Sequence, residues 1–64
     1  MKIDRVKLIT EMARRELGVS ALAARCGVSR ATVTAVKTGK TCSDQTARKL
    51  ADALGVPLVA LMQE

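Results

Sequence analysis

The side chains in this sequence that could do chemistry are mostly cations, and they are unevenly distributed. The 64 residues include eleven Lys and Arg against six Asp and Glu, which gives a net charge of +5. No carboxylate occurs between Leu17 and Ser43. The charged residues in that stretch are Arg25, Arg30, Lys37 and Lys40. A stretch with positive charges and no negative ones is suited to binding anions such as a phosphate backbone. An excess of basic residues is, however, also typical of small soluble domains.

The same residues do not form a set for catalysis or metal binding. An active site needs a nucleophile, a group that titrates near neutral pH, or a metal, and this chain has no His and only scattered carboxylates. Cys26 and Cys42 supply fewer ligands than a zinc site takes. Cys26 is at an inward helical position, and Cys42 is expected in a loop. We therefore expect no enzyme, no metal and no cofactor, and no small-molecule ligand is evident.

Length and hydropathy narrow the class of protein further. A chain of 64 residues is near the lower limit for one core, so we expect a single domain over 1–64. Hydrophobic residues make up 48% of the chain, yet no aromatic residue is present. Binding of single strands or RNA by base stacking is therefore disfavoured. No apolar run is long enough for a signal peptide or a membrane span, which predicts a cytoplasmic protein without membrane contact.

The central cations must be positioned by two short helices joined by a tight turn, over residues 18–39. Gly27 is where a helix needs a left-handed C-terminal residue, and Ser29 can accept hydrogen bonds from the first N–H groups of the next helix. Apolar residues recur at helical spacing on both sides of this turn. They predict a small shared core of Leu22, Ala23, Cys26, Val28, Val33 and Val36.

The second of these helices, expected over 30–38 and ended by Gly39, has an unusual outward face. With its valines inward, the residues that face outward are Ala31, Thr34, Ala35 and Thr38, with Arg30 at the N-terminal end. Small side chains and one arginine on a short helix suit insertion into the major groove of duplex DNA.

A capped helix is also predicted before this pair. Asp4 can cap it, and it should run to about Glu16 or Leu17. Its buried stripe is expected to be Leu8, Ile9, Met12 and Ala13. Its solvated side carries Arg5, Lys7, Arg14 and Arg15. One of these four cations can contact a phosphate that flanks the binding site.

Two further elements are predicted after the pair. Ser43 or Asp44 can cap a helix that ends at Gly55, and Pro57 can open a last helix over 58–63. The buried face of the first is expected to be Ala47, Leu50, Ala51 and Leu54. In the last helix, the inward residues are expected among Leu58, Leu61 and Met62. These residues and Val59 cannot all point inward at the same time, and Met62 is one of those that would compete for the space. Some apolar surface is therefore left for a dimer partner.

Two segments resemble the phage repressor and Cro type of helix-turn-helix DNA-binding domain. They are LAARCGVSRATVTAVKTGK at 22–40 and LADALGV at 50–56. With the first helix included, the resemblance covers almost the whole chain. It implies an all-α, lambda-repressor-like bundle of about five short helices that binds a roughly palindromic operator as a homodimer.

Geometry and resemblance together assign a set of DNA-binding residues. They are Ser20, Ser29, Arg30, Ala31, Thr32, Thr34, Lys37, Thr38 and Lys40. Members of the family often carry a backbone-binding glutamine where this chain has Val19, so Ser20 or the free N–H groups of its helix would replace that contact. The family commonly has glutamate at Lys37, paired with an arginine at Met12. Here we expect Lys37 to extend toward Glu11 or Glu16 rather than read a base.

The function indicated is sequence-specific binding of double-stranded DNA by a small transcriptional regulator, a repressor. The alternative is a protein-interaction module or an antitoxin with the same fold, since shape does not determine function. The size of Ala31 and Ala35 favours DNA, because a protein-binding face would carry larger apolar residues there.

Overall fold

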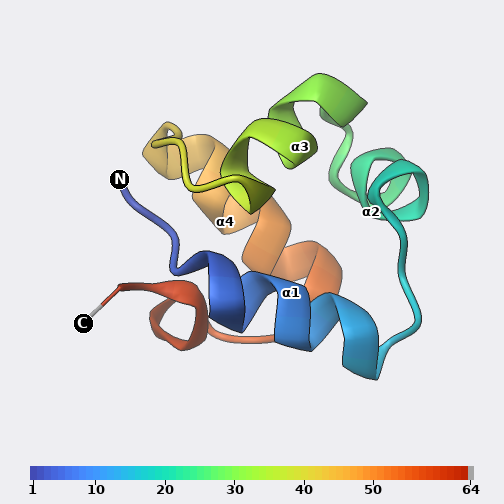
Figure 1. Cartoon of the computed structure of the whole chain (residues 1–64), viewed down its shortest axis with the longest axis horizontal. Coiled ribbons are helices and arrows are strands. Elements are labelled where there is room, and N and C mark those ends of the chain that lie inside the picture. The colour runs from blue at the N-terminus through green and yellow to red at the C-terminus, as the bar shows by residue number, and fades with distance from the viewer. Residues whose placement is uncertain (64) are drawn as a thin grey trace.

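A computed structural model describes residues 1–63, which form four α-helices and one short 3-10 helix. In chain order these are α1 (Arg5–Arg14), α2 (Val19–Cys26), α3 (Arg30–Lys37), α4 (Asp44–Leu54) and η1 (Leu58–Leu61) (Figure 1). The all-α fold expected from the sequence is confirmed. The last helix expected over 58–63 is instead a single 3-10 turn, because Met62 is already extended, with φ −76° and ψ 145°.

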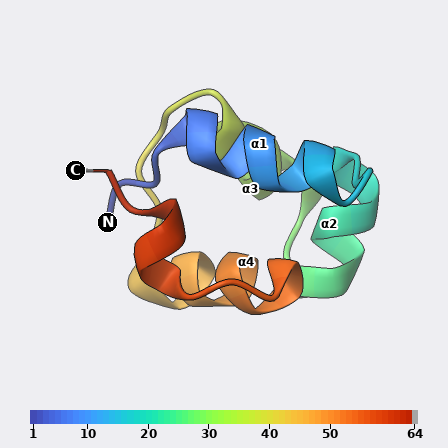
Figure 2. The same cartoon turned by 90° about the horizontal axis from the view of Figure 1, so that it is seen from below.

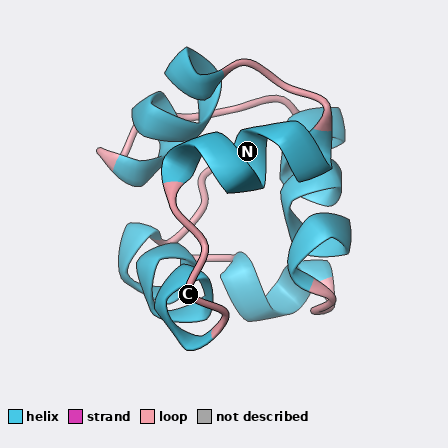
Figure 3. Cartoon of the chain, turned by 90° about the vertical axis from the view of Figure 1, so that its right-hand side faces the viewer, coloured by secondary structure: helices cyan, strands magenta, loops and turns pink. Residues whose placement is uncertain are grey.

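The helices surround one core in a domain of 26 × 21 × 18 Å. α1 and α4 lie on opposite sides, and α2 closes one end (Figure 2). Viewed toward that end, the helices are arranged about a common centre (Figure 3). The side chains that fill the centre are Ile3, Leu8, Met12, Leu22, Ala23, Cys26, Val33, Val36, Ala47, Leu50, Ala51, Leu54 and Leu61. The predicted face of α4 is thus confirmed in full, and Val28 alone of the predicted α2–α3 core is only half-buried.

Three side-chain caps begin the helices where the sequence places them. The Asp4 carboxylate accepts hydrogen bonds from two N–H groups in the first turn of α1. The Ser29 and Ser43 hydroxyls each accept one from the first turn of α3 and α4. Of the two candidate caps for α4, Ser43 is therefore the one used. Each such cap contributes about 1 kcal/mol, which is considerable in a domain of this size.

Two residues predicted to be buried on α1 lie outside the core. Ile9 is 39% exposed, and Ala13 is exposed as well. α1 packs mainly against α3 and η1. Because these two elements cover only a narrow strip of α1, the buried residues are limited to Leu8 and Met12, which are one turn apart on the same face. The prediction of a four-residue stripe was therefore wrong for half of its members.

α1 also ends earlier than expected, because Glu16 adopts a left-handed conformation with φ 53°. The N–H of Leu17 donates to the Met12 carbonyl at 2.9 Å, and the N–H of Glu16 donates to the Ala13 carbonyl at 3.1 Å. This pair of bonds closes a helix end that normally carries glycine. Within residues 1–63 the Glu16 side chain makes no ion pair that would offset the steric cost.

Replacement of Glu16 by Gly should therefore stabilise the domain. Relief of the left-handed strain is worth about 1 kcal/mol, which would raise Tm by about 4 to 8 °C. Thermal unfolding followed by far-UV circular dichroism measures the change. The matched control is Gly55→Ala, where φ is 69° and an added Cβ would meet nothing within 4 Å. The Tm of the Gly55→Ala control should fall by about as much as the Tm of Glu16→Gly rises. A Glu16→Gly variant with a lower Tm would contradict the explanation.

The first four residues form an extended arm that the sequence analysis did not predict. The Met1 amino group donates to the Cys42 carbonyl at 2.8 Å, and the N–H of Cys42 donates to the Met1 carbonyl at 3.0 Å. Further along, Ile3 pairs with Met62 in an isolated antiparallel bridge, and the Asp4 N–H donates to the Leu61 carbonyl at 2.8 Å. The arm is thus attached to both the α3–α4 loop and the η1 end.

The C-terminal segment buries one of its apolar residues fully. Leu61 is 0% exposed, whereas Val59 is 69% and Met62 is 37% exposed. The expectation that not all of these residues can point inward is confirmed. Met62 is paired with Ile3 in the bridge, and of the two side chains only that of Ile3 is buried.

Candidate nucleic-acid interface

The turn between α2 and α3 holds the two helices in one relative orientation. Gly27 ends α2 in the left-handed conformation, with φ 71°, and its N–H donates to the Ala23 carbonyl at 2.9 Å. Val33 and Val36 are 0% and 1% exposed, so one side of α3 is fully committed to the core. The opposite side of α3 is therefore fixed toward solvent.

The free side of α3 carries short side chains. Ala31, Thr34 and Thr38 are exposed, and Ala35 is half-buried. The Thr38 hydroxyl donates to the Ala35 carbonyl at 2.8 Å, so it is turned back onto its own helix. Because no side chain on this surface is long, another molecule can approach close to the helix backbone. Such an approach is what a helix in the major groove requires.

Arg30 and Ser20 are brought together although they belong to different helices. The Arg30 Nη1 donates to the Ser20 Oγ over 3.4 Å, a long hydrogen bond between two exposed residues. Ser20 lies in the first turn of α2, whose N-cap residue Gly18 provides no side-chain hydrogen bond. The N–H groups that begin α2 therefore lie close to the guanidinium of α3.

Ser29 and Thr32 are positioned beside Arg30 by the cap of α3. The Ser29 hydroxyl accepts from the Thr32 N–H at 3.1 Å, and the two hydroxyl oxygens are 2.9 Å apart. Ser29 is exposed and Thr32 is half-buried. The two residues thus begin α3, and each oxygen retains further hydrogen-bonding capacity.

Lys37 does not reach the carboxylates that the sequence suggested. The two Glu11 oxygens are paired with Arg14 at 3.2 Å and Arg15 at 2.7 Å. Lys37 instead lies half-buried along a shallow hollow that is lined by Ile9, Met12, Ala13 and Leu17. Lys37 thus lies against α1, as expected, but within residues 1–63 it makes no ion pair with Glu11 or Glu16.

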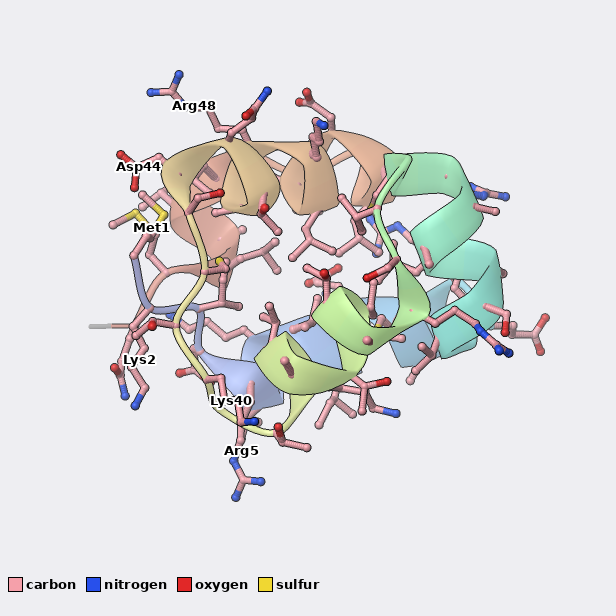
Figure 4. The ribbon with its side chains drawn as sticks, turned by 90° about the horizontal axis from the view of Figure 1, so that it is seen from above. Met1, Lys2, Arg5, Lys40, Asp44 and Arg48 are labelled. Carbon is pink, nitrogen blue, oxygen red and sulfur yellow. The ribbon has the colours of Figure 1, made fainter. Side chains whose placement is uncertain are left out.

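Lys40 lies in the loop that follows α3. Its N–H donates to the Ala35 carbonyl at 3.0 Å, which leaves its exposed side chain beside the end of α3. Lys2 and Arg5 extend on the same side of the molecule as Lys40 (Figure 4). Sequence spacing contains no signal for this cluster, because the arm that carries Lys2 is not helical and is placed by backbone contacts.

Cys26 and Cys42 are free thiols, the first buried and the second half-buried. Burial raises the pKa of the Cys26 thiol, an effect that Lys49 partly opposes, and burial also raises the pKa of the Cys42 thiol. Both thiols are thus neutral at neutral pH and are weak nucleophiles. Among residues 1–63, no cluster of three His, Cys, Asp or Glu could hold a metal ion. None of the described helices has the length and apolar character needed to cross a membrane.

Two solved structures share this architecture over 100% of the chain. One is described as native PhpD with cadmium atoms, at 25% identity and a TM-score of 0.86. The other is PhpD with cadmium complexed with hydroethylphosphonate, also at 25% identity, with a TM-score of 0.85. The match covers only 14% of either PhpD chain. No curated protein matches the sequence.

A family model with the description "Helix-turn-helix" matches residues 11–61, which includes all of α2, α3 and α4. The matched range thus contains the turn, the free face of α3 and the basic loop described above. The fold is of the lambda-repressor type. The chain therefore belongs to the XRE and Cro type of helix-turn-helix proteins, a family whose members bind DNA.

Proposed function

We propose that the chain recognises a specific sequence of double-stranded DNA and acts as a small transcriptional regulator, a repressor that excludes polymerase from its site. The observation that carries this proposal is the free face of α3, which is short, uncharged and bordered by Arg30 and Lys40. In this proposal residues 1–64 act as one DNA-binding domain in the cytoplasm. Catalysis and small-molecule ligands have no part in it.

Base recognition falls to the residues on the free face. Arg30 can donate two hydrogen bonds to guanine O6 and N7, which is a common specific contact in the major groove. Thr34 is about one turn along α3, where its methyl can touch a thymine methyl. Ala31 adds apolar contact only. We therefore expect specificity to be concentrated at few base pairs.

Backbone contact falls to the groups around that face. The uncapped N–H groups of α2 and the Ser20 hydroxyl can bind one phosphate in place of the glutamine usual in the family. Ser29 and Thr32 have oxygens at the start of α3, and Thr38 has one at its end. Lys40 can neutralise a further phosphate. Lys37 has a supporting role at most, since its stem lies along α1.

A homodimer on a palindromic operator is the assembly we propose. Val59 is 69% and Val6 is 64% exposed, and Met62 is at the surface too. Val6 is on α1 and Met62 follows η1, two elements that pack together. Covering these side chains with a second copy would remove apolar surface from water, which favours association.

Selection of bound sequences from random duplex DNA tests the proposal, followed by titration of the selected duplex at several salt concentrations. We expect the logarithm of the binding constant to fall linearly with the logarithm of salt concentration, by roughly 0.9 for each phosphate neutralised. At saturation, sedimentation should show two chains on each palindromic duplex. A scrambled duplex of equal length is the control for non-specific binding.

Two results would overturn the proposal. Selection that enriches no sequence, with binding that is indifferent to salt, would favour the protein-interaction or antitoxin alternative. Saturation of an asymmetric site by one chain would contradict the proposed homodimer but not the proposed recognition of DNA. The alternative is already disfavoured by the exposed Ala31 and half-buried Ala35, where a protein-binding surface would carry bulkier apolar groups.

A further inference from the structure

The extended arm places two cations beside the C-terminal end of the recognition helix. Reciprocal hydrogen bonds of 2.8 and 3.0 Å join Met1 to Cys42, in the loop between α3 and α4. Two residues later, the buried Ile3 side chain and its bridge to Met62 hold the arm on its other side. Lys2 lies between these attachments, and its position next to the loop is thereby fixed.

Arg5 approaches the same place from the start of α1. A Cβ added at Gly39 would come within 3.8 Å of the Arg5 Cδ, so the stem of Arg5 lies along the residue that follows the end of α3. An open hollow of about 390 Å³ is lined here by Lys2, Arg5, Thr38 and Gly39, among others. Lys2, Arg5 and Lys40 all extend on this side, whereas Arg48 extends on the opposite side (Figure 4).

The cluster brings three cations together, with one carboxylate, that of Asp4, beside them. Within residues 1–63, none of Lys2, Arg5 and Lys40 makes an ion pair. The Asp4 carboxylate lines the hollow too, but it accepts hydrogen bonds from the Val6 and Lys7 N–H groups at 2.9 and 3.2 Å. Both bonds are made to the Oδ1 atom, and within residues 1–63 the Asp4 carboxylate forms no ion pair with the neighbouring cations.

We propose that Lys2 and Arg5 join Lys40 in a phosphate clamp that binds the DNA backbone beyond the C-terminal end of α3. This inference rests on the proposed DNA-binding function and extends it to the arm. The clamp is continuous with the free face of α3 through Thr38 and Gly39. The eight residues of α3 span about 12 Å, close to the width of the major groove of about 12 Å. Ser20 and the α2 N–H groups beside the start of α3, and the clamp beside its end, can therefore meet phosphates on both sides of the groove.

The test compares the wild-type chain with the Lys2→Ala/Arg5→Ala double variant on the selected duplex. Because both side chains are exposed, the variant should remain folded, which circular dichroism verifies. We expect the salt slope to decrease by roughly 0.9 for each phosphate lost per bound chain, with unchanged preference among bases. Arg5→Lys should retain the slope, since a point charge is sufficient there. Arg48→Ala, which removes an exposed cation on the other side, should retain it as well.

The position of the contact is tested by shortening the duplex beyond the recognised bases. We expect shortening to weaken the wild-type chain more than the double variant, which retains only Lys40 of the clamp. An unchanged slope in the double variant would overturn the clamp while the wild-type chain still selects its sequence. Failure of the proposed function is a distinct result, in which the wild-type chain selects no sequence. A slope that falls equally in Arg48→Ala would also reject the clamp, because it would reflect net charge alone.

Discussion

Replacement of Arg30 by Ala should weaken binding to the selected duplex and abolish preference at one base pair in each half-site. The loss in discrimination should be about 1 to 3 kcal/mol, the value of one bidentate arginine–guanine contact. Arg30 is exposed at the first position of α3, and among residues 1–63 its side chain bonds only to Ser20, over 3.4 Å. It is therefore free to exchange that bond for a base edge. Binding to a panel of duplexes with single base changes measures the effect.

Two control variants separate base reading from charge. Lys40→Ala should weaken all duplexes about equally and lower the salt slope by roughly 0.9 per phosphate. Arg30→Lys keeps the charge but loses the planar pair of donors, so its preference should fall almost as far as in Arg30→Ala. If Arg30→Ala retains both affinity and full sequence preference, then Arg30 is only a solvated residue at a helix start. A uniform loss over all duplexes would instead assign it to the backbone.

Replacement of Ile3 by Ala should destabilise the fold by about 2 to 5 kcal/mol. Ile3 is only 1% exposed, and its side chain fills the core from outside any helix. A domain of 64 residues is stable by about 3 to 10 kcal/mol in total, so the substitution would remove a large share. Urea unfolding followed by far-UV circular dichroism gives the change in the free energy of unfolding.

Val6→Ala is the matched control, because it removes methyl groups from a neighbouring residue that is 64% exposed. Its cost should stay within about 0.5 kcal/mol. Ile3→Val should cost about 0.5 to 1.5 kcal/mol, since a single methylene is lost. Equal costs for Ile3→Ala and Val6→Ala would show that the arm is not part of the folded core.

The elements that could be predicted are those specified by local chemistry. Ser29, Gly27 and Gly55 mark helix ends through caps and left-handed backbone, and each does so in the structure. Helical spacing also predicts the face of α4, because that helix is covered along its length. The same rule fails for Ile9, since the width of a buried stripe depends on how many neighbours a helix has, which spacing alone does not reveal.

The candidate site divides in the same way. The free face of α3 follows from the inward valines, so Ala31 and Thr34 could be placed from the sequence. The absence of an ion pair at Lys37 within residues 1–63 could not be predicted, because both Glu11 oxygens are paired with Arg14 and Arg15. The cluster of Lys2 and Arg5 beside Gly39 arises from backbone pairing between distant segments. The pattern of side chains along the sequence does not predict that pairing.

The pairing of the arm also implies an order in which the domain assembles and opens. Met1 and Cys42 are 41 positions apart, so their contact closes a long loop and loses chain entropy. α2 and α3 are joined by a turn of three residues, and their contact loses far less. The turn and its two helices can therefore form first, and we expect the arm to dock late. Its release would withdraw Lys2 from the end of α3 while the turn stays intact.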